Sequence, residues 1–547
     1  MKKSIRLFSA AVLGAAAIAC SSPEKMAEQA ENVLVSCDPA VLEVKAGVID
    51  ANVTVTYPAD YFHPKAILEV IPVIVYDGGE AKMESYFFQG TKVEDNYEVV
   101  PEEGATITKP VHFEYAEGME NCHLELRGVV KYKADKTDLP TKKVADGANT
   151  TYMLVKKDAK AAVDFKADNY QETIPMPVEG QILYTINSAN VRNSEIKSQS
   201  IKDFQAALDE IAANERKTLT GTEVVAYASP DGGEELNTKL SDKRAKSAEK
   251  AFNKVTKGKE TGETSVKSVG QDWEGFQELV AASDIEDKDL IIRVLSMYSD
   301  PAVRENEIKN MSAVYKTLAD EVLPQLRRGR FIANCEYQNY TGEELIKLVD
   351  ENIDVLDEEA LLRAATLVKE PADKEAIYKK AVEKYDSNRA QYNLAVVYIN
   401  EGKFEKADKA LDKCEQDADW NNAKGVVALN TGDEAAASKY FAAAGNATAK
   451  ANEAVVDILN GRYEAAAAKL AGQKSFNAAL AQVLVKNYAA AEAALPECDC
   501  ACVAYLKAVI AARQGKADAV KANLEAASKC EKLAKRAEKD IEFAQYR

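Results

Sequence analysis

A pattern of small and bulky residues recurs through the last third of the chain and restricts that region to stacked helices. Strand-like runs stop after Glu343, and alanine becomes frequent. Glycines that follow apolar runs of helical spacing recur at positions 402, 432, 461 and 515. A short helical repeat cannot bury its apolar face alone and has to stack on its neighbours. We therefore expect residues 341–547 to form an all-α helical solenoid.

One unit of this pattern resembles a tetratricopeptide repeat (TPR). The residues that match the family's spacing are Leu394, Ala395, Tyr398, Gly402, Phe404, Ala407 and Leu411. The resemblance implies a groove in which a protein partner docks as a peptide or a helix. The alternative is that polar residues on the expected first helices only solvate that surface. The candidates for the groove are Tyr392, Asn393, Lys424 and Asn452.

The N-terminus has the features of an export signal. Basic residues precede an apolar run over residues 7–18, which is too short to span a bilayer permanently. The segment Ala17-Ile18-Ala19-Cys20 resembles a bacterial lipobox, which implies that residues 1–19 are removed and Cys20 is acylated. The alternative is an ordinary secretory signal that leaves Cys20 as a free thiol. Residues 20–32 are expected to form a flexible tether.

Multiple acyl chains anchor a protein stably to a bilayer. No apolar run after the signal reaches the ~18 residues that a spanning helix needs. We therefore expect an outer-membrane protein held by its lipid alone. The periplasmic side is favoured, with the cell surface as the alternative.

Residues 33–165 alternate apolar and polar residues, as in antiparallel strands separated by tight turns. An N-terminal antiparallel β-sandwich of roughly immunoglobulin size follows. Export permits disulfides, and a bridge between Cys37 and Cys122 would join the first and last strands of this domain. The second cluster, Cys498, Cys500 and Cys502, has no further ligand at metal-binding spacing. A disulfide among these three and Cys530, or buried thiols, is expected there.

Residues 170–340 alternate strand and helix patterns, and one stretch resembles the signature of OmpA-like domains. The motif positions present are Asn237, Leu240, Ser241, Arg244 and Ala245. The resemblance implies a central α+β domain. A stretch of about 50 residues, roughly 274–325, departs from the family as a helical insertion.

The usual ligand of OmpA-like domains is the diaminopimelate of peptidoglycan. Its carboxylate meets the motif Arg, here Arg244, and its ammonium meets an Asp. Ser229 stands at that Asp position, and Asp231 lies two residues further on. The alternative is that Arg244 makes a salt bridge that supports the fold. Asn237, Ser229, Asp231 and Arg244 are therefore the candidate peptidoglycan-binding residues.

Charge and residue usage exclude some functions. The net charge of -18 has the wrong sign for a nucleic-acid-binding surface. The chain has 3 His and neither a G-x-S-x-G nor an H-E-x-x-H motif, so no catalytic residue, metal or cofactor is expected. These features predict a non-enzymatic envelope scaffold that binds protein partners and the cell wall. The alternatives are a surface adhesion or assembly subunit and, ranked lower, a cell-wall hydrolase.

Overall fold

The computed structural model describes residues 23–158, 162–285, 288–310 and 312–547. Its contacts divide the chain into two compact units. The first, which we call the β–helical unit, combines the chain up to Lys166 with Asn388–Arg547, and the second, the central unit, is Ala167–Ser387. Cys20 and the expected signal peptide lie outside the described residues. Within the described residues, no helix is long and apolar enough to cross a membrane.

The N-terminal half of the β–helical unit is a folded sheet that has eleven strands among the described residues. Strands β3 and β8 form one layer and β4 and β9 the other, and the parallel pair β2–β11 joins the two layers. The predicted β-rich domain is thus confirmed, although as one folded sheet. The strands are β1 Leu34–Asp38, β2 Val41–Lys45, β3 Val48–Tyr57, β4 Ile67–Tyr76, β5 Gly79–Lys82, β6 Tyr86–Gln89, β7 Glu98–Val99, β8 Ala105–Glu114, β9 Cys122–Tyr132, β10 Asp135–Asp138 and β11 Lys142–Asn149.

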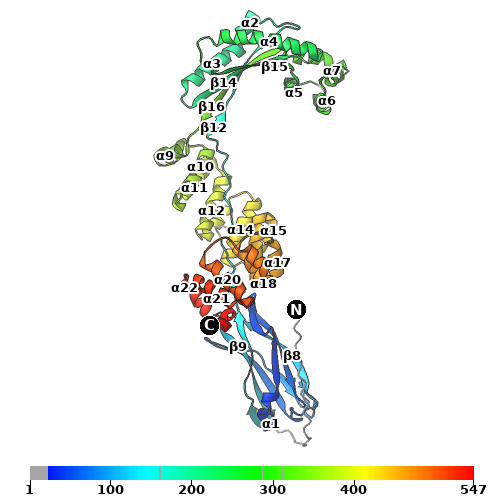
Figure 1. The fold of residues 1–547 in the computed structure, drawn as a ribbon, viewed down its shortest axis with the longest axis vertical. Helices are drawn as coiled ribbons and strands as arrows, with labels where there is room; N and C mark the ends of the chain where they lie inside the picture. Colours follow the sequence, from blue (N-terminus) through cyan, green and yellow to red (C-terminus); the bar gives the residue numbers. More distant parts are fainter. Residues whose placement is uncertain (1–22, 159–161, 286–287, 311) are drawn as a thin grey trace. The chain divides into compact units, whose positions relative to one another are not determined.

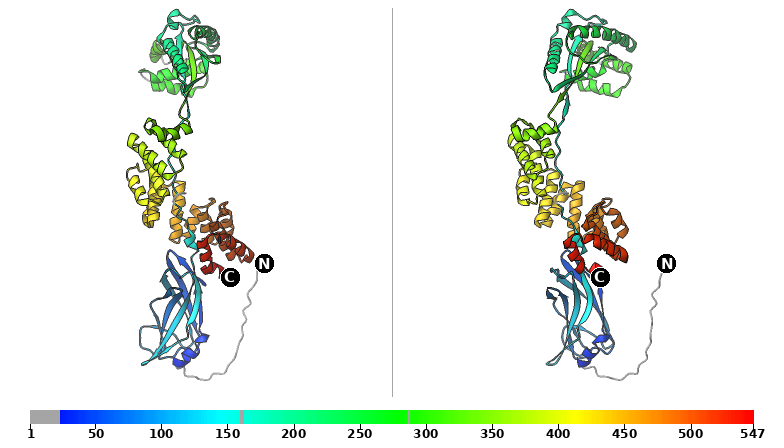
Figure 2. Two further views of the ribbon diagram at one scale, coloured as in Figure 1. Left: turned by 90° about the vertical axis from the view of Figure 1, so that its left-hand side faces the viewer. Right: turned by 60° about the vertical axis from the view of Figure 1, so that its left-hand side comes forward.

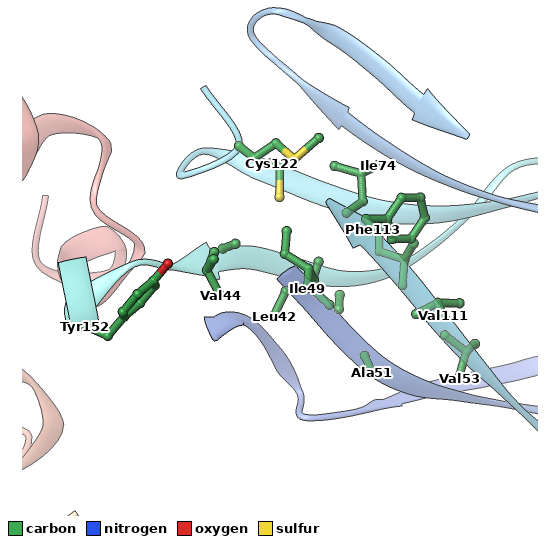
Figure 3. Packing of buried hydrophobic residues seen from close by; sticks show 14 of the residues in the cluster. Leu42, Val44, Ile49, Ala51, Val53, Ile74, Val111, Phe113, Cys122 and Tyr152 are labelled. Carbon is green, nitrogen blue, oxygen red and sulfur yellow. The ribbon is translucent and has the colours of Figure 1, made fainter. Parts of the chain in front are cut away.

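Alternating side chains of these strands fill the core between the layers. On β3, Ile49, Ala51 and Val53 are buried and their neighbours Asp50 and Asn52 are exposed, as the pleat of a strand requires. Figure 3 shows these residues beside side chains of the facing strands. Apolar alternation in the sequence therefore fixes which face of each strand is buried.

Two predictions about this domain are wrong. Residues 23–32 are not a free tether: they form α1 (Pro23–Glu28) and η1 (Ala30–Asn32), and the fully buried Met26 packs into the sheet core. Cys37 and Cys122 are both free thiols. The reason is the strand order, which places three strands between β1 and β9, so that the two cysteines are not on neighbouring strands.

The central unit alternates strands and helices around an independent core. Strand β14 pairs in parallel with β15 and antiparallel with β16, and α3 and α4 lie against the sheet (Figure 1). Phe204 of α3, Phe252 of α4 and Phe331 of β16 belong to the core between helices and sheet. The elements are β12 Thr173–Pro175, β13 Val178–Leu183, α2 Asn193–Ile196, α3 Gln199–Ala213, β14 Lys217–Ala228, α4 Glu234–Val255, β15 Thr264–Gln271 and β16 Arg328–Gln338.

Between β15 and β16 the chain forms helices that carry a separate small core around Phe276 and Leu326. They are α5 Trp273–Ala282, α6 Lys288–Met297, α7 Pro301–Asn310, α8 Ser312–Thr317 and η3 Leu318–Val322. Pro301 stands at the first position of α7, where its missing N–H has no helical acceptor to lose.

The first helices of the expected solenoid belong to the central unit: α9 (Gly342–Asn352), η4 (Ile353–Val355), α10 (Glu358–Leu367) and α11 (Pro371–Tyr385). An ion pair between Arg216 and Glu344 (2.8 Å) and a hydrogen bond from Tyr170 to the carbonyl of Tyr340 (2.8 Å) connect this region to the sheet. The sequence pattern does not report such long-range contacts, so it does not reveal that the helical array divides here.

The β–helical unit contains the rest of the array as antiparallel helical pairs (Figure 2). The predicted C-terminal helical array is confirmed. The pairs are α12 Asn388–Asn400 with α13 Phe404–Leu411, α14 Ala418–Thr431 with α15 Glu434–Ala444, α16 Ala447–Leu459 with α17 Tyr463–Lys469, α18 Phe476–Leu484 with α19 Tyr488–Ala494, and α20 Ala501–Arg513 with α21 Ala517–Ala527. Helices α22 Glu531–Lys539 and η5 Ile541–Tyr546 follow.

The turn inside each pair needs a left-handed backbone, which explains the recurring glycines. Gly402, Gly432, Gly461 and Gly515 have φ values of 72°, 93°, 69° and 73°. The corresponding residue between α18 and α19 is Lys486, with φ of 61°. Four of the five turns therefore use the residue that adopts this conformation at least cost.

The sheet and the last helical pairs share one hydrophobic core. Polar contacts at its edge also join them: Asn149 and Thr151 both donate to the carboxylate of Glu542, at 2.7 and 2.8 Å, and Arg536 donates to the carbonyl of Thr150 at 2.9 Å. The helical array therefore holds the β-domain of its own chain as a fixed part of one unit.

Candidate functional site: an asparagine row on the helical repeats

Four asparagines on successive first helices form the most regular polar feature of the helical array. Asn393 lies on α12, Asn422 on α14, Asn452 on α16 and Asn477 on α18. We call these four residues the asparagine row. Each contacts the main chain of the segment that follows the β-domain, described here by residues 155–158 and 162–166 and called the bound segment.

Asn393 pairs with both main-chain groups of Lys166. Its side-chain oxygen accepts from the amide of Lys166 at 2.7 Å, and its amide group donates to the carbonyl of Lys166 at 2.9 Å. Asn393 is 1% exposed, so both bonds are shielded from water. A side-chain amide that donates and accepts in this way repeats the pairing of a neighbouring β-strand.

Asn477 makes the same pair of contacts at the other end of the bound segment. Its oxygen accepts from the amide of Lys156 at 2.9 Å, and its amide group donates to the carbonyl of Lys156 at 2.9 Å. Between the two ends, Asn422 and Asn452 both donate to the carbonyl of Ala162, at 2.7 and 2.9 Å. Asn452 also donates to the oxygen of Asn422 at 2.9 Å, so these two side chains orient each other.

Side chains of the bound segment add apolar and ionic contacts. Ala162 and Val163 are buried. The ammonium of Lys166 lies 5.1 Å from the ring centre of Tyr392 and pairs with the carboxylate of Asp417. Beside the segment, a cavity of about 200 Å³ is lined by Val426, Asn452, Val455, Asn477 and neighbouring residues.

The structure brings together two of the four predicted groove residues, Asn393 and Asn452. Tyr392 is 2% exposed, and burial raises the pKa of its hydroxyl; it contributes its ring face to Lys166. Lys424 does not reach the bound segment. Its ammonium pairs with Asp408 and Asp412 of the preceding pair, at 2.7 and 2.6 Å, so its role is to connect neighbouring repeats.

Sequence reasoning missed Asn422 and Asn477. A signal for them exists: each asparagine of the row stands nine or ten residues before the left-handed turn residue of its pair, which is Gly402, Gly432, Gly461 or Lys486. The fourth member was hard to recognise because its turn residue is a lysine. In the fifth pair this position holds no asparagine, and Tyr505 there donates to Asp540 instead.

The chemistry of the row is recognition of main-chain groups. The side-chain amides form hydrogen bonds with main-chain carbonyl and N–H groups. Every residue except proline has one of each. The row therefore fits an extended polypeptide at defined intervals and imposes few requirements on its side chains. In the structure the polypeptide that it binds belongs to the same chain.

The motif residues of the central unit lie together, but their polar groups are already paired. Arg244 is 1% exposed and donates to the carbonyls of Ser188 (2.9 Å), Tyr227 (2.9 Å) and Thr185 (3.3 Å). Burial lowers the pKa of its guanidinium to about 10. Arg244 thus supports the fold through carbonyls and the ring of Tyr184, which differs from the salt bridge that the sequence suggested.

The remaining candidates stabilise the turn before α4. Asn237 donates to the carbonyls of Ser229 and Gly232 at 3.1 and 2.7 Å. The hydroxyl of Ser229 donates to Asp231 at 2.5 Å, and Asp231 forms an ion pair with Arg327 at 3.1 Å. Asp231, the carboxylate two residues beyond Ser229, is thus already paired with Arg327.

In the part of the chain that the structure describes, no group of three or more His, Cys, Asp or Glu is arranged to hold a metal ion. The architecture of the β–helical unit is that of a helical-repeat protein with a β-domain attached to its last repeats.

No protein-family model matches the sequence, and no curated protein matches it. Among solved structures, a tetratricopeptide repeat protein from Parabacteroides merdae ATCC 43184 has a TM-score of 0.29 and 13% identity, covering 43% of this chain and 98% of its own. The APC/C hetero-tetramer Cut9–Hcn1 has a TM-score of 0.31 and 12% identity, covering 62% of this chain and 81% of the other. At these TM-scores neither similarity assigns a family or a partner.

Proposed function

We propose that this protein is a non-enzymatic, lipid-anchored envelope scaffold whose helical repeats bind extended polypeptide. One observation carries the proposal: four asparagines on successive helical pairs bond to main-chain groups of a single segment. A row of side-chain amides that bonds to main-chain groups at intervals can hold an extended chain in place. Such amides are not catalytic groups.

The first polypeptide that the repeats hold is their own bound segment. A partner that uses the asparagine row has to displace this segment, whereas a partner that leaves it in place uses another surface of the repeats. The proposal therefore has two experimental arms, which separate recognition of main chain from recruitment of a partner.

For recognition, a fluorescent synthetic peptide of residues 153–168 is titrated into the full chain and into its Asn422→Ala/Asn452→Ala variant. Excess peptide should compete with the bound segment in the unsubstituted protein and bind more weakly to the variant. Asn421→Ala is the matched control, because the side-chain amide of Asn421 donates to the carbonyl of Asp417, at the start of its own helix (2.9 Å). Equal binding to all three proteins would refute the role of the row.

For recruitment, the tagged full chain is purified from detergent-solubilised envelopes after cross-linking in cells. A scaffold should bring down a defined protein in a constant ratio. If the chain is recovered alone at every cross-linker concentration, the scaffold proposal fails even where the peptide titration succeeds.

The lipid anchor is proposed from the lipobox-like segment ending at Cys20, and the outer membrane, on its periplasmic side, is the proposed location. Mass spectrometry of the native N-terminus should show acyl chains on Cys20. An unmodified N-terminus together with a cytosolic pool would contradict the anchor.

We propose that the protein binds the cell wall only weakly, because Ser229 replaces the expected Asp and Asp231 is paired with Arg327. Retention of the full chain on insoluble peptidoglycan should be low and should increase in Ser229→Asp, which restores the carboxylate that the resemblance to OmpA-like domains implies at this position. If the unsubstituted chain is retained as strongly as Ser229→Asp, the pairing argument is wrong.

A further inference from the structure

Three sulfur atoms lie together where the fifth helical pair begins. Cys498 and Cys500 form a disulfide, and the sulfur of Cys502 lies 3.3 Å from that of Cys500. Cys498 is exposed, whereas Cys500 and Cys502 are partly buried. A free thiol in contact with a disulfide is the arrangement from which thiol–disulfide exchange starts.

A lysine of the bound segment stands next to the free thiol. The ammonium of Lys156 donates to the sulfur of Cys502 at 2.9 Å and lies 4.4 Å from the ring centre of Phe476. Asn477 holds the main chain of Lys156 through both of its polar groups. In exchange reactions the nucleophile is the thiolate, whose negative charge attracts an adjacent ammonium during the attack. Asn477 of the asparagine row thus places a cation beside the sulfur that contacts the disulfide.

Lys156 and Cys502 also line a cavity of about 640 Å³ between the β-domain and the last helices. Five cations line this cavity, and three of them form ion pairs: Lys535 with Glu531, Arg536 with Asp540 and Lys539 with Asp77. Lys156, whose ammonium contacts Cys502, brings positive charge to the cavity wall at this sulfur. The cavity has room for a small thiol, and a negatively charged thiol that approaches Cys502 would be attracted by the ammonium of Lys156.

We propose that Cys498, Cys500 and Cys502 form a thiol–disulfide exchange site for small anionic thiols. In the internal step, the thiolate of Cys502 attacks the sulfur of Cys500. The Cys500–Cys502 bond forms, the Cys498–Cys500 bond breaks, and Cys498 leaves as a thiolate that takes up the proton released by Cys502. One disulfide replaces another, so no oxidant or reductant is consumed.

This shift moves the disulfide to the cavity wall beside Lys156. There the thiolate of a small anionic thiol attacks the sulfur of Cys502, forms a mixed disulfide with it, and releases Cys500 as a thiolate. The negative charge that selects the substrate is the charge that the ammonium of Lys156 attracts.

The internal step is tested by alkylating the purified full chain with N-ethylmaleimide and locating the label by tandem mass spectrometry. Trypsin cleaves after Lys486 and Lys507 and leaves all three cysteines on one peptide. Exchange should label Cys498 in some molecules and Cys502 in others. In Cys502→Ser, Cys498 should stay unlabelled, because no thiol remains to release it. Label on Cys502 alone in the unsubstituted chain, at all reaction times, would overturn the proposal.

The role of the lysine is tested by the rate at which labelled Cys498 appears. Lys156→Met should slow it at least about fivefold, and Asn477→Ala should slow it as well, because it frees the main chain of Lys156. Lys157→Met is the control, since Lys157 is exposed and has no place in the sulfur cluster. Equal rates in Lys156→Met and Lys157→Met would overturn the assignment of Lys156.

The substrate class is tested with two probes, glutathione as an anionic thiol and cysteamine as a cationic one. At equal thiolate concentration, glutathione should form the mixed disulfide on Cys502 several-fold faster. Lys156→Met should remove this preference, because it removes the ammonium beside Cys502. Equal rates for both probes in the unsubstituted chain would overturn selection by charge.

Discussion

Replacing Asn393 by alanine should release one end of the bound segment and leave the other end in place. The substitution removes two hydrogen bonds with Lys166, at 2.7 and 2.9 Å, from a side chain that is 1% exposed. At about 1 kcal/mol of net stabilisation for each bond, the local opening free energy at Lys166 should fall by about 2 kcal/mol. A change of this size corresponds to about 30-fold faster exchange of the Lys166 amide.

Hydrogen exchange with single-residue resolution measures this change on the intact chain. At the far end of the bound segment, the amide N–H of Lys156 donates to the side-chain oxygen of Asn477. This amide should stay protected from hydrogen exchange in Asn393→Ala and should lose that protection in Asn477→Ala. Asn421→Ala should alter neither amide. The reasoning would be refuted if Lys166 kept its protection in Asn393→Ala. It would also be refuted if both amides lost protection together, since that would indicate global unfolding in place of a local clamp.

Further substitutions test the packing and the other proposed sites. Gly425→Ala should destabilise the β–helical unit by about 1–3 kcal/mol in denaturant titrations, because its Cβ would lie 2.5 Å from the ring of Phe441, and Phe441→Leu should restore part of the loss. Lys486→Gly should stabilise the same unit by about 1 kcal/mol, since φ of 61° is costly for lysine; no gain would contradict the turn argument. Arg244→Ala should lower the free energy of unfolding of the central unit by about 4 kcal/mol, because three carbonyls lose a charged donor. The melting temperature should fall accordingly, and an unchanged value would refute this role. Cys20→Ser should abolish membrane retention of the full chain in cell fractionation.

The sequence and the structure agree on the kind of elements and on their faces. Apolar and polar residues were predicted to alternate in strands over residues 33–165, and the buried Ile49, Ala51 and Val53 of β3 follow that alternation, because a strand's side-chain period depends only on local backbone geometry. The turn glycines and the small residues of the helical pairs were recognisable for the same reason. Asn393 and Asn452 could be placed on first helices, since helix position follows from the repeat.

What the groove contains was decided by tertiary structure. Nothing local in residues 155–166 indicates that the segment lies against Asn393, more than two hundred positions later in the chain. The absence of a Cys37–Cys122 bridge, the burial of Met26 and the division of the helical array after Ser387 have the same origin. Each depends on which distant surfaces meet, and a residue pattern specifies which side of an element is apolar without specifying the surface that covers it. The sequence by itself therefore determined the repeats and their polar face, and the fold determined that the chain's own segment occupies it.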